Sequence, residues 1–283
     1  MRPIHVPAVL GVALIASVVV LATAWTSPAR AGWEYGDEAE LFVAENHFDH
    51  LAVGSDGCGG MLVATVDPES SPPSCRVSRV DHNGTEVWGN EGSQLMWVLG
   101  QEAQLGPLAV THDGAGGAWV AYRARYDGFY MLWLGHVDAD GACDKMQGID
   151  NFGAMTSGEV AEVRMIPVGM HDVLLVWKQF GATPRLYAAR VDLDGFVWHD
   201  PVTNTAVTDD VFRLVGDGQG GALVGYHVAG PPGEIRAQRI QGTNGTLLWN
   251  GLSGALVWGS SLGAFGDIVR DGSGGAFLVR SDA

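Results

Sequence analysis

The sequence predicts an all-β fold built from about five copies of one four-stranded unit. Three observations support this. A short phrase recurs along the chain, a second phrase trails it at a fixed place, and helical periodicity is absent beyond the first thirty or so residues. Together they predict strands joined by tight turns.

The first phrase is Asp-Gly-x-Gly-Gly followed by an apolar run. It begins at residues 56, 113, 217 and 271, and a degenerate copy begins at 168, so the successive intervals are 57, 55, 49 and 54 residues. Asp-Gly pairs supply the positive φ that tight hairpins need, and here they lie between apolar, β-branched and aromatic runs. Each copy therefore predicts a turn between two strands.

The second phrase is Arg-Val-Asp-x-Asp-Gly with a tryptophan shortly after it. It begins at Arg79, His136 and Arg190, and more loosely at Arg239, and the tryptophans are Trp88, Trp198 and Trp249. In the second unit the two phrases predict strands near 107–112, 117–124, 131–137 and 142–147. Because the tryptophans recur at equivalent places, we expect them to pack between units.

A period near 50 residues with four strands per unit predicts a small β-propeller of about five blades. A β-sandwich or an open stack of sheets would explain the strands but not the period. The fifth unit supplies two strands, near 264–270 and 275–280. A strand at 38–45 would complete this last blade and close the ring; the alternative is a fragment of a longer reading frame.

The two phrases resemble the repeats of exported bacterial β-propeller proteins, and the resemblance covers essentially all of 45–280. The trailing Asp-x-x-Gly-x-x-x-Trp element is also similar to the blades of quinoprotein dehydrogenases. Those enzymes typically use more blades and a cofactor-binding centre that cannot be placed in this sequence. The resemblance implies a fold and an exported setting and, by itself, no activity.

The N-terminus predicts export. A positive start, an apolar run from 6 to 25 and Ala29-Arg30-Ala31 predict a signal peptide at 1–31 cleaved after Ala31, with an uncleaved anchor as the alternative. The domain is then 32–283, in a secreted or periplasmic protein without a later membrane span. The formal net charge of −16 argues against nucleic acid and anionic membrane partners.

Ligands are expected at the end of the units opposite the tight turns, where the connections vary in length. The second-to-third-strand connections there are 67–74, 125–130, 179–185 and 229–234. The predicted ligand-binding residues are Trp97, Arg125, Tyr126, Tyr130, Arg185, Asp209, Asp210 and Trp258. Aromatic and charged loops of this kind suit a protein or carbohydrate partner; packing of the loops on one another is the alternative.

No metal site or cofactor is predicted. Asp138-x-Asp140 and Asp192-x-Asp194 resemble the start of a calcium loop but lack its later ligands, so turn stabilisation is the simpler explanation. In the His47–His50 segment, residues three apart in a strand point to opposite faces. The sequons at Asn83 and Asn244 fit hairpin turns.

Cys58, Cys75 and Cys143 allow one disulfide with one leftover thiol, or three free thiols.

The preferred function is a non-enzymatic binding or scaffold module, and no catalytic residue is identified. The alternatives are a small propeller enzyme acting on glycans, a quinone-dependent oxidoreductase, and a purely structural surface repeat. Carboxylates or arginines that converge with perturbed pKa values would indicate an enzyme. An aromatic or charged patch without that convergence would indicate a binding protein.

Overall fold

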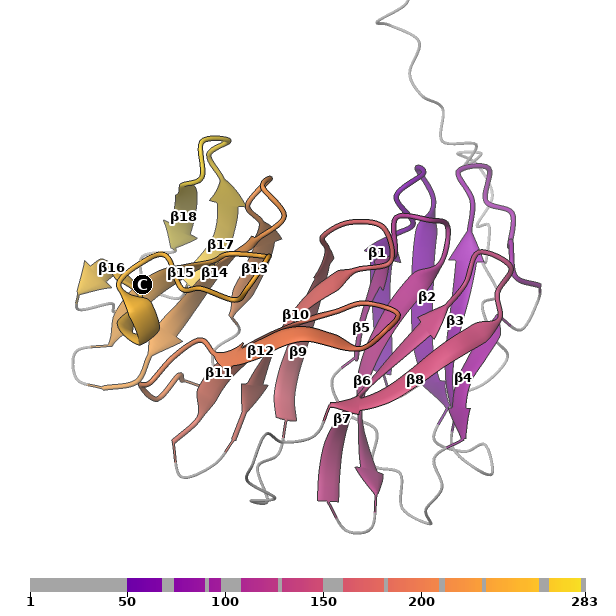
Figure 1. The fold of residues 1–283 in the computed structure, drawn as a ribbon, viewed down its shortest axis with the longest axis horizontal. Coiled ribbons are helices and arrows are strands. Elements are labelled where there is room, and N and C mark those ends of the chain that lie inside the picture. Colours follow the sequence, from indigo (N-terminus) through magenta and orange to yellow (C-terminus); the bar gives the residue numbers. More distant parts are fainter. Residues whose placement is uncertain are drawn as a thin grey trace, which may run out of the picture. The chain divides into compact units, whose positions relative to one another are not determined.

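The computed structural model describes residues 50–67, 74–89, 92–97, 108–126, 129–149, 160–180, 183–208, 212–230, 233–259 and 265–280. All of them belong to one compact unit, 40–283. Their regular structure is β-strand apart from one turn of 3-10 helix, η1 (Gly251–Ser253) (Figure 1). No helix among them is long and apolar enough to cross a membrane. The predicted leader and the strand expected at 38–45 lie outside the described residues.

The strands form five antiparallel sheets in which neighbours in sequence pair with each other. Sheet 1 contains β1 (His50–Ser55), β2 (Met61–Asp67), β3 (Ser74–Val80) and β4 (Ser93–Trp97). Sheet 2 contains β5 (Leu108–His112), β6 (Ala118–Tyr126), β7 (Phe129–Val137) and β8 (Cys143–Ile149). Sheet 3 contains β9 (Val160–Pro167), β10 (Val173–Gln179), β11 (Arg185–Val191) and β12 (Phe196–Pro201). Sheet 4 contains β13 (Arg213–Gly216), β14 (Ala222–Val228), β15 (Glu234–Ile240) and β16 (Ala255–Gly259). Sheet 5 contains β17 (Phe265–Arg270) and β18 (Ala276–Arg280).

The all-β class and the four-stranded repeat are confirmed, because four of the described sheets each contain four antiparallel strands in sequence order. In the second unit every predicted strand end lies within two residues of the observed one. The fifth unit contains two strands, as predicted, among the residues that the structure describes.

The first phrase forms the turn between the first and second strands of a unit. In sheet 2, Asp113 Oδ1 accepts hydrogen bonds from the backbone N–H groups of Ala115 and Gly117, at 2.7 and 2.8 Å. Gly114 and Gly116 have φ values of 79° and 100°. The side chain thus satisfies the N–H groups that the turn leaves unpaired, and glycine supplies the left-handed backbone.

Consecutive sheets bury their facing sides against each other. The first strands contact one another in order, β1 with β5, β5 with β9, β9 with β13 and β13 with β17. Between sheets 2 and 3 the buried core includes Trp119, Leu134, Leu175 and Trp177. Burial contributes about 1.5–3 kcal/mol for each large apolar side chain, so a sheet depends on its neighbours for stability.

Two of the recurring tryptophans, Trp88 and Trp198, join the units through hydrogen bonds in addition to the packing that the sequence predicts. Trp88 Nε1 donates to the carbonyl oxygen of Ala139 in the second unit, at 3.1 Å. Trp198 Nε1 donates to the carbonyl oxygen of Gly242 in the fourth unit, at 2.7 Å.

Candidate functional site

Most of the predicted ligand-binding side chains lie outside the described residues: Trp97, Arg125, Tyr126, Tyr130, Asp209 and Asp210. The backbone nevertheless corrects two expectations. Residues 125–130 are not a loop, because β6 continues to Tyr126 and β7 starts at Phe129, and these two residues are paired. Trp97 and Trp258 likewise belong to strands β4 and β16.

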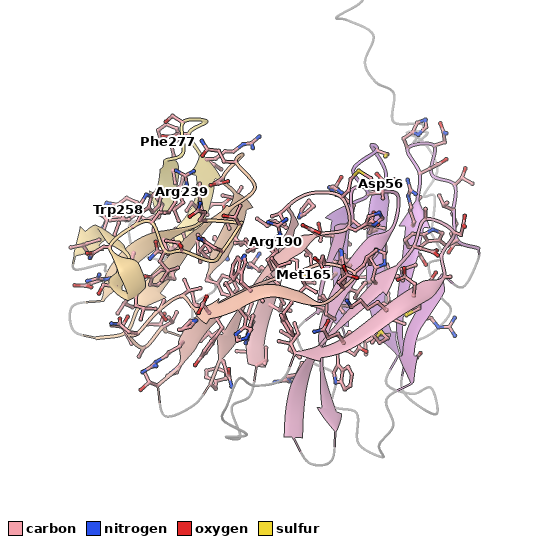
Figure 2. All side chains as sticks on the ribbon, viewed as in Figure 1. Asp56, Met165, Arg190, Arg239, Trp258 and Phe277 are labelled. Atoms are coloured by element: carbon pink, nitrogen blue, oxygen red, sulfur yellow. The ribbon has the colours of Figure 1, made fainter. Side chains whose placement is uncertain are left out.

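Two predicted residues have described side chains, Arg185 and Trp258. Arg185 begins β11 and is half-buried, and its buried Nε has no hydrogen-bond partner among the described residues. The half-buried ring of Trp258 lies 5.4 Å from the guanidinium carbon of Arg280. Arg185 belongs to sheet 3 and Trp258, labelled in Figure 2, to sheet 4, and the predicted ligand-binding face stays a prediction.

An aspartate–arginine pair recurs at the opposite end, where the tight turns lie. Asp56 accepts from Arg79 Nε at 3.2 Å, and Asp217 accepts from Arg239 Nε at 2.9 Å; Asp56 and Arg239 are labelled in Figure 2. Arg79 Nη1 also donates to the carbonyl oxygen of Gly116 in the next unit, at 2.8 Å. The guanidinium therefore joins its own turn to the neighbouring sheet.

The pattern changes in the third unit. There Val168 stands where the other turns have aspartate, and Asp172, four residues later, accepts from Arg190 Nε at 3.1 Å. The pair is thus kept with its aspartate moved along the turn.

The second unit departs further, because His136 replaces the arginine. His136 Nε2 lies 3.1 Å from Asp113 Oδ2, and its Nδ1 lies 2.6 Å from Asp144 Oδ1. A second histidine, His171, comes from the turn between β9 and β10, and its Nδ1 also lies 3.1 Å from Asp113 Oδ2. One carboxylate oxygen of sheet 2 thus meets imidazoles from two sheets.

The turn that carries His171 has an unusual backbone conformation and is held by two hydrogen bonds to sheet 2. His171 has a φ of 63°, at the position that the other turns give to a glycine with positive φ. Its backbone N–H donates to the carbonyl oxygen of Asp113 at 2.6 Å, and its carbonyl oxygen accepts from Trp119 Nε1 at 3.2 Å. A non-glycine residue in this conformation is uncommon, and strained positions of this kind cluster at functional sites.

Burial distinguishes the members of the cluster. The side chains of Asp113 and His136 are each 1% exposed, whereas that of His171 is 39% exposed. The buried His136 ring also packs against the ring of Trp119, with 4.6 Å between centroids. The cluster therefore has a closed side in sheet 2 and a solvent side at His171.

Hydrogen bonding outweighs burial in setting the protonation of the buried pair. Burial alone would raise the pKa of Asp113, but hydrogen bonds from His136 and from the turn N–H groups hold it well below its usual range. Burial would lower the pKa of His136, but its two carboxylate partners, Asp113 and Asp144, raise it. The two carboxylates favour the charged form of the imidazole, at the place that the guanidinium has in the other units.

The same three groups present the donor set of a metal centre. Asp113, His136 and His171 each offer one ligand atom, and these atoms all lie within 4.8 Å of one another. Bonds of about 2.0–2.1 Å at tetrahedral angles set ligand atoms about 3.3 Å apart, and both oxygen–nitrogen distances in the cluster are 3.1 Å. A bound ion would take the place of the proton at His136 Nε2 while Nδ1 keeps its bond to Asp144, which is the outer-shell arrangement typical of metal-bound histidines.

A second polar cluster lies on the first strands of sheets 3 and 4. Glu162 Oε1 accepts from Arg164 Nε at 2.8 Å, and Arg213 Nε donates to the carbonyl oxygen of Gly266 at 2.9 Å. Burial raises the pKa of Glu162, although Arg164 and Arg213 act against this shift.

The aspartates whose spacing resembles the start of a calcium loop accept hydrogen bonds within their own turns. Asp138 Oδ1 accepts from the N–H groups of Asp140 and Ala142, at 3.0 and 2.9 Å. Asp192 Oδ1 accepts from the N–H of Asp194 at 2.8 Å. These contacts agree with turn stabilisation.

The cysteines form no disulfide. Cys75 is buried, whereas Cys58 and Cys143 are exposed, so of the two alternatives the structure has three free thiols.

Comparison with known proteins gives a likeness of fold and no family. No family model matches the chain, and no curated protein matches it. Similar solved structures include an endo-arabinase from Bacteroides thetaiotaomicron, at 11% identity over 73% of this chain and 78% of that one, with a TM-score of 0.42. A Bombyx mori GH32 β-fructofuranosidase is 11% identical over 81% of this chain and 53% of that one, with a TM-score of 0.39. A protein of unknown function from Dyadobacter fermentans is 11% identical over 69% and 79%, with a TM-score of 0.33. Likeness at this level assigns no activity to this chain, and the resemblance to exported bacterial propeller repeats stays a prediction.

The histidine–aspartate cluster was not predicted, although the sequence contains two signals for it. His136 is the one first residue of the second phrase that is not arginine, and His171 lies in the one degenerate copy of the first phrase. These departures fall in adjacent units and involve a residue type that commonly binds metals.

Proposed function

We propose that this chain is an exported binding protein whose binding centre is a divalent transition-metal ion held by Asp113, His136 and His171. The observation that carries the proposal is the convergence of the two imidazoles on one carboxylate oxygen, each at 3.1 Å. In the second unit, histidine and aspartate side chains stand where the other units have a structural aspartate–arginine pair. Such a departure from the repeat is expected at a functional position.

The donor types favour zinc or a neighbouring transition metal. Calcium and magnesium prefer sites made of oxygen ligands, whereas imidazole suits zinc, copper, nickel, cobalt and iron. The burial of Asp113 and His136 restricts motion on one side of the centre. His171, on its turn at the surface, would close onto an ion that the other two residues hold.

The expected setting outside the cytoplasm agrees with a binding role for this centre. Export, a secreted or periplasmic location, and a protein or carbohydrate partner on the variable-loop face stay predictions from the sequence. The metal centre lies at the tight-turn end, so it is separate from that face.

Calorimetric titration of zinc into the purified full chain, freed of metal with a chelator, tests the proposal. We expect one site per chain. The His136→Arg variant supplies the residue that the other units have at this place, so it should fold and lose the site. The Asp144→Asn variant should bind about 10–100-fold more weakly, because it removes the charge that orients His136.

The exposed His82, outside the cluster, provides the control. His82→Ala should bind zinc as the unchanged chain does. Zinc binding that persists in His136→Arg and in a His171→Gly variant would overturn the proposal, as would no binding to the unchanged chain.

A further inference from the structure

The geometry points to an exchangeable position on the proposed ion: we propose that the metal at Asp113, His136 and His171 binds a small carboxylate ligand from solution. This inference rests on the proposed metal centre. It adds the class of ligand that the centre takes.

The nearby polar atoms that the structure describes have other partners. Asp113 Oδ1 accepts two turn N–H groups, at 2.7 and 2.8 Å, which leaves Oδ2 for an ion. Asp144 binds the far nitrogen of the His136 ring. The carbonyl oxygen of Asp113 accepts the His171 N–H, and that of His171 accepts Trp119 Nε1.

Three protein ligands leave a zinc-type ion one ligand short. Such ions are usually four-coordinate, and sites with three protein ligands hold water or an exogenous ligand in the fourth position. Among the described residues, the donor set is limited to Asp113, His136 and His171. A solvent molecule would therefore complete the coordination.

The fourth position faces solvent. His136 and Asp113 are 1% exposed and His171 is 39% exposed, so the accessible side of the centre is the His171 side. The neighbouring Met170 is 70% exposed. A small ligand can reach the ion there without the sheets separating.

Charge selects an anion for this position. A divalent ion bound by one carboxylate and two neutral imidazoles carries a net charge of about +1, and Asp144 lies beyond the ring of His136. An incoming carboxylate neutralises the centre and supplies the oxygen donor that zinc accepts. In the exchange the bound water leaves as the carboxylate oxygen binds, and no bond of the ligand breaks.

Cobalt-loaded full chain tests this inference, because the visible absorption of Co²⁺ reports its ligands. Cobalt alone should give visible bands, which His136→Arg should lack. Acetate added at constant ionic strength should then change the bands to a saturable limit at one anion per ion, and azide should compete with acetate. Removal of acetate by dialysis should restore the first spectrum, which shows that cobalt was retained.

The outcomes separate the two proposals. Cobalt bands that neither acetate nor azide alters would overturn the carboxylate position and leave the metal centre standing. Azide binding without acetate binding would overturn the ligand class. An absence of cobalt binding to the unchanged chain would overturn the metal centre itself, and the present inference with it.

Discussion

Removal of the Asp217 carboxylate tests the interactions on which the repeat depends. Asp217 is 4% exposed and accepts from the N–H groups of Gln219 and Gly221, at 2.7 and 2.9 Å, and from Arg239 Nε at 2.9 Å. In Asp217→Ala the exposed Gln219 N–H can turn to water, whereas the buried Gly221 N–H cannot.

The expected loss follows from these contacts. A stranded buried N–H costs about 1–3 kcal/mol, and a hydrogen bond to a charged group contributes about 1.5–3 kcal/mol. We therefore expect Asp217→Ala to lower the free energy of unfolding by about 3–4 kcal/mol. For a domain of this size the loss corresponds to a fall in Tm of about 6–15 °C.

Asp271 provides the matched control. It stands at the same place in the fifth unit and accepts from Ser273 and Gly275, but it is exposed and no arginine pairs with it in the described part of the chain. Equilibrium urea unfolding of Asp217→Ala and Asp271→Ala should show a much smaller loss for the second variant. Equal losses, or a loss below about 1 kcal/mol for Asp217→Ala, would refute the reasoning.

Three further predictions concern pH, a joint between units, and the thiols. Burial acts to raise the pKa of Asp217, but hydrogen bonds from the turn and Arg239 lower this pKa below 3.8. The ionised Asp217 side chain therefore stabilises the fold above pH 3.8, and this stabilisation is lost as the pH falls through the folded-state pKa. Between about pH 5 and pH 2, the unchanged chain should lose more unfolding free energy than Asp217→Asn, and parallel curves would contradict this. Trp198→Phe removes the bond to Gly242 and should cost about 1 kcal/mol in urea unfolding, beyond any packing change. In a thiol-reagent assay Cys58 should react at once and Cys75 only after unfolding, because burial raises the pKa of Cys75 and hides it; early reaction of Cys75 would count against the buried position of β3.

Much of the fold was predictable because the repeat places its turns in the sequence. An Asp-Gly pair fixes a local backbone conformation, so the strands on either side can be positioned without knowledge of the rest of the molecule. The connection at 125–130 shows a signal that the prediction did not use. It contains Asp127-Gly128 between aromatic residues, which favours a two-residue hairpin, and the strands accordingly extend to Tyr126 and from Phe129.

The candidate site was harder to predict because its members meet only when sheets stack. His136 and His171 are 35 residues apart in sequence. His136 belongs to the sheet of β5–β8, whereas His171 lies in a turn of the sheet of β9–β12. Local patterns give the turn that carries each residue but not the approach of one turn to the next. That approach depends on side-chain packing between sheets, which places Trp119 of sheet 2 and Leu175 of sheet 3 in one shared core.

A comparison of His136 with the arginines of the other units indicates why a cation would fit between sheets 2 and 3. In sheet 1, Arg79 places one positive charge on Asp56 and reaches Gly116 of the next unit. The imidazole of His136 is shorter, and both of its nitrogens are engaged by Asp113 and Asp144 within its own sheet. The next unit therefore extends His171 to Asp113. The cation proposed above, bound among these three groups, would take the place of the guanidinium that links the other units, and because His171 is half-exposed, one of its coordination positions would face solvent.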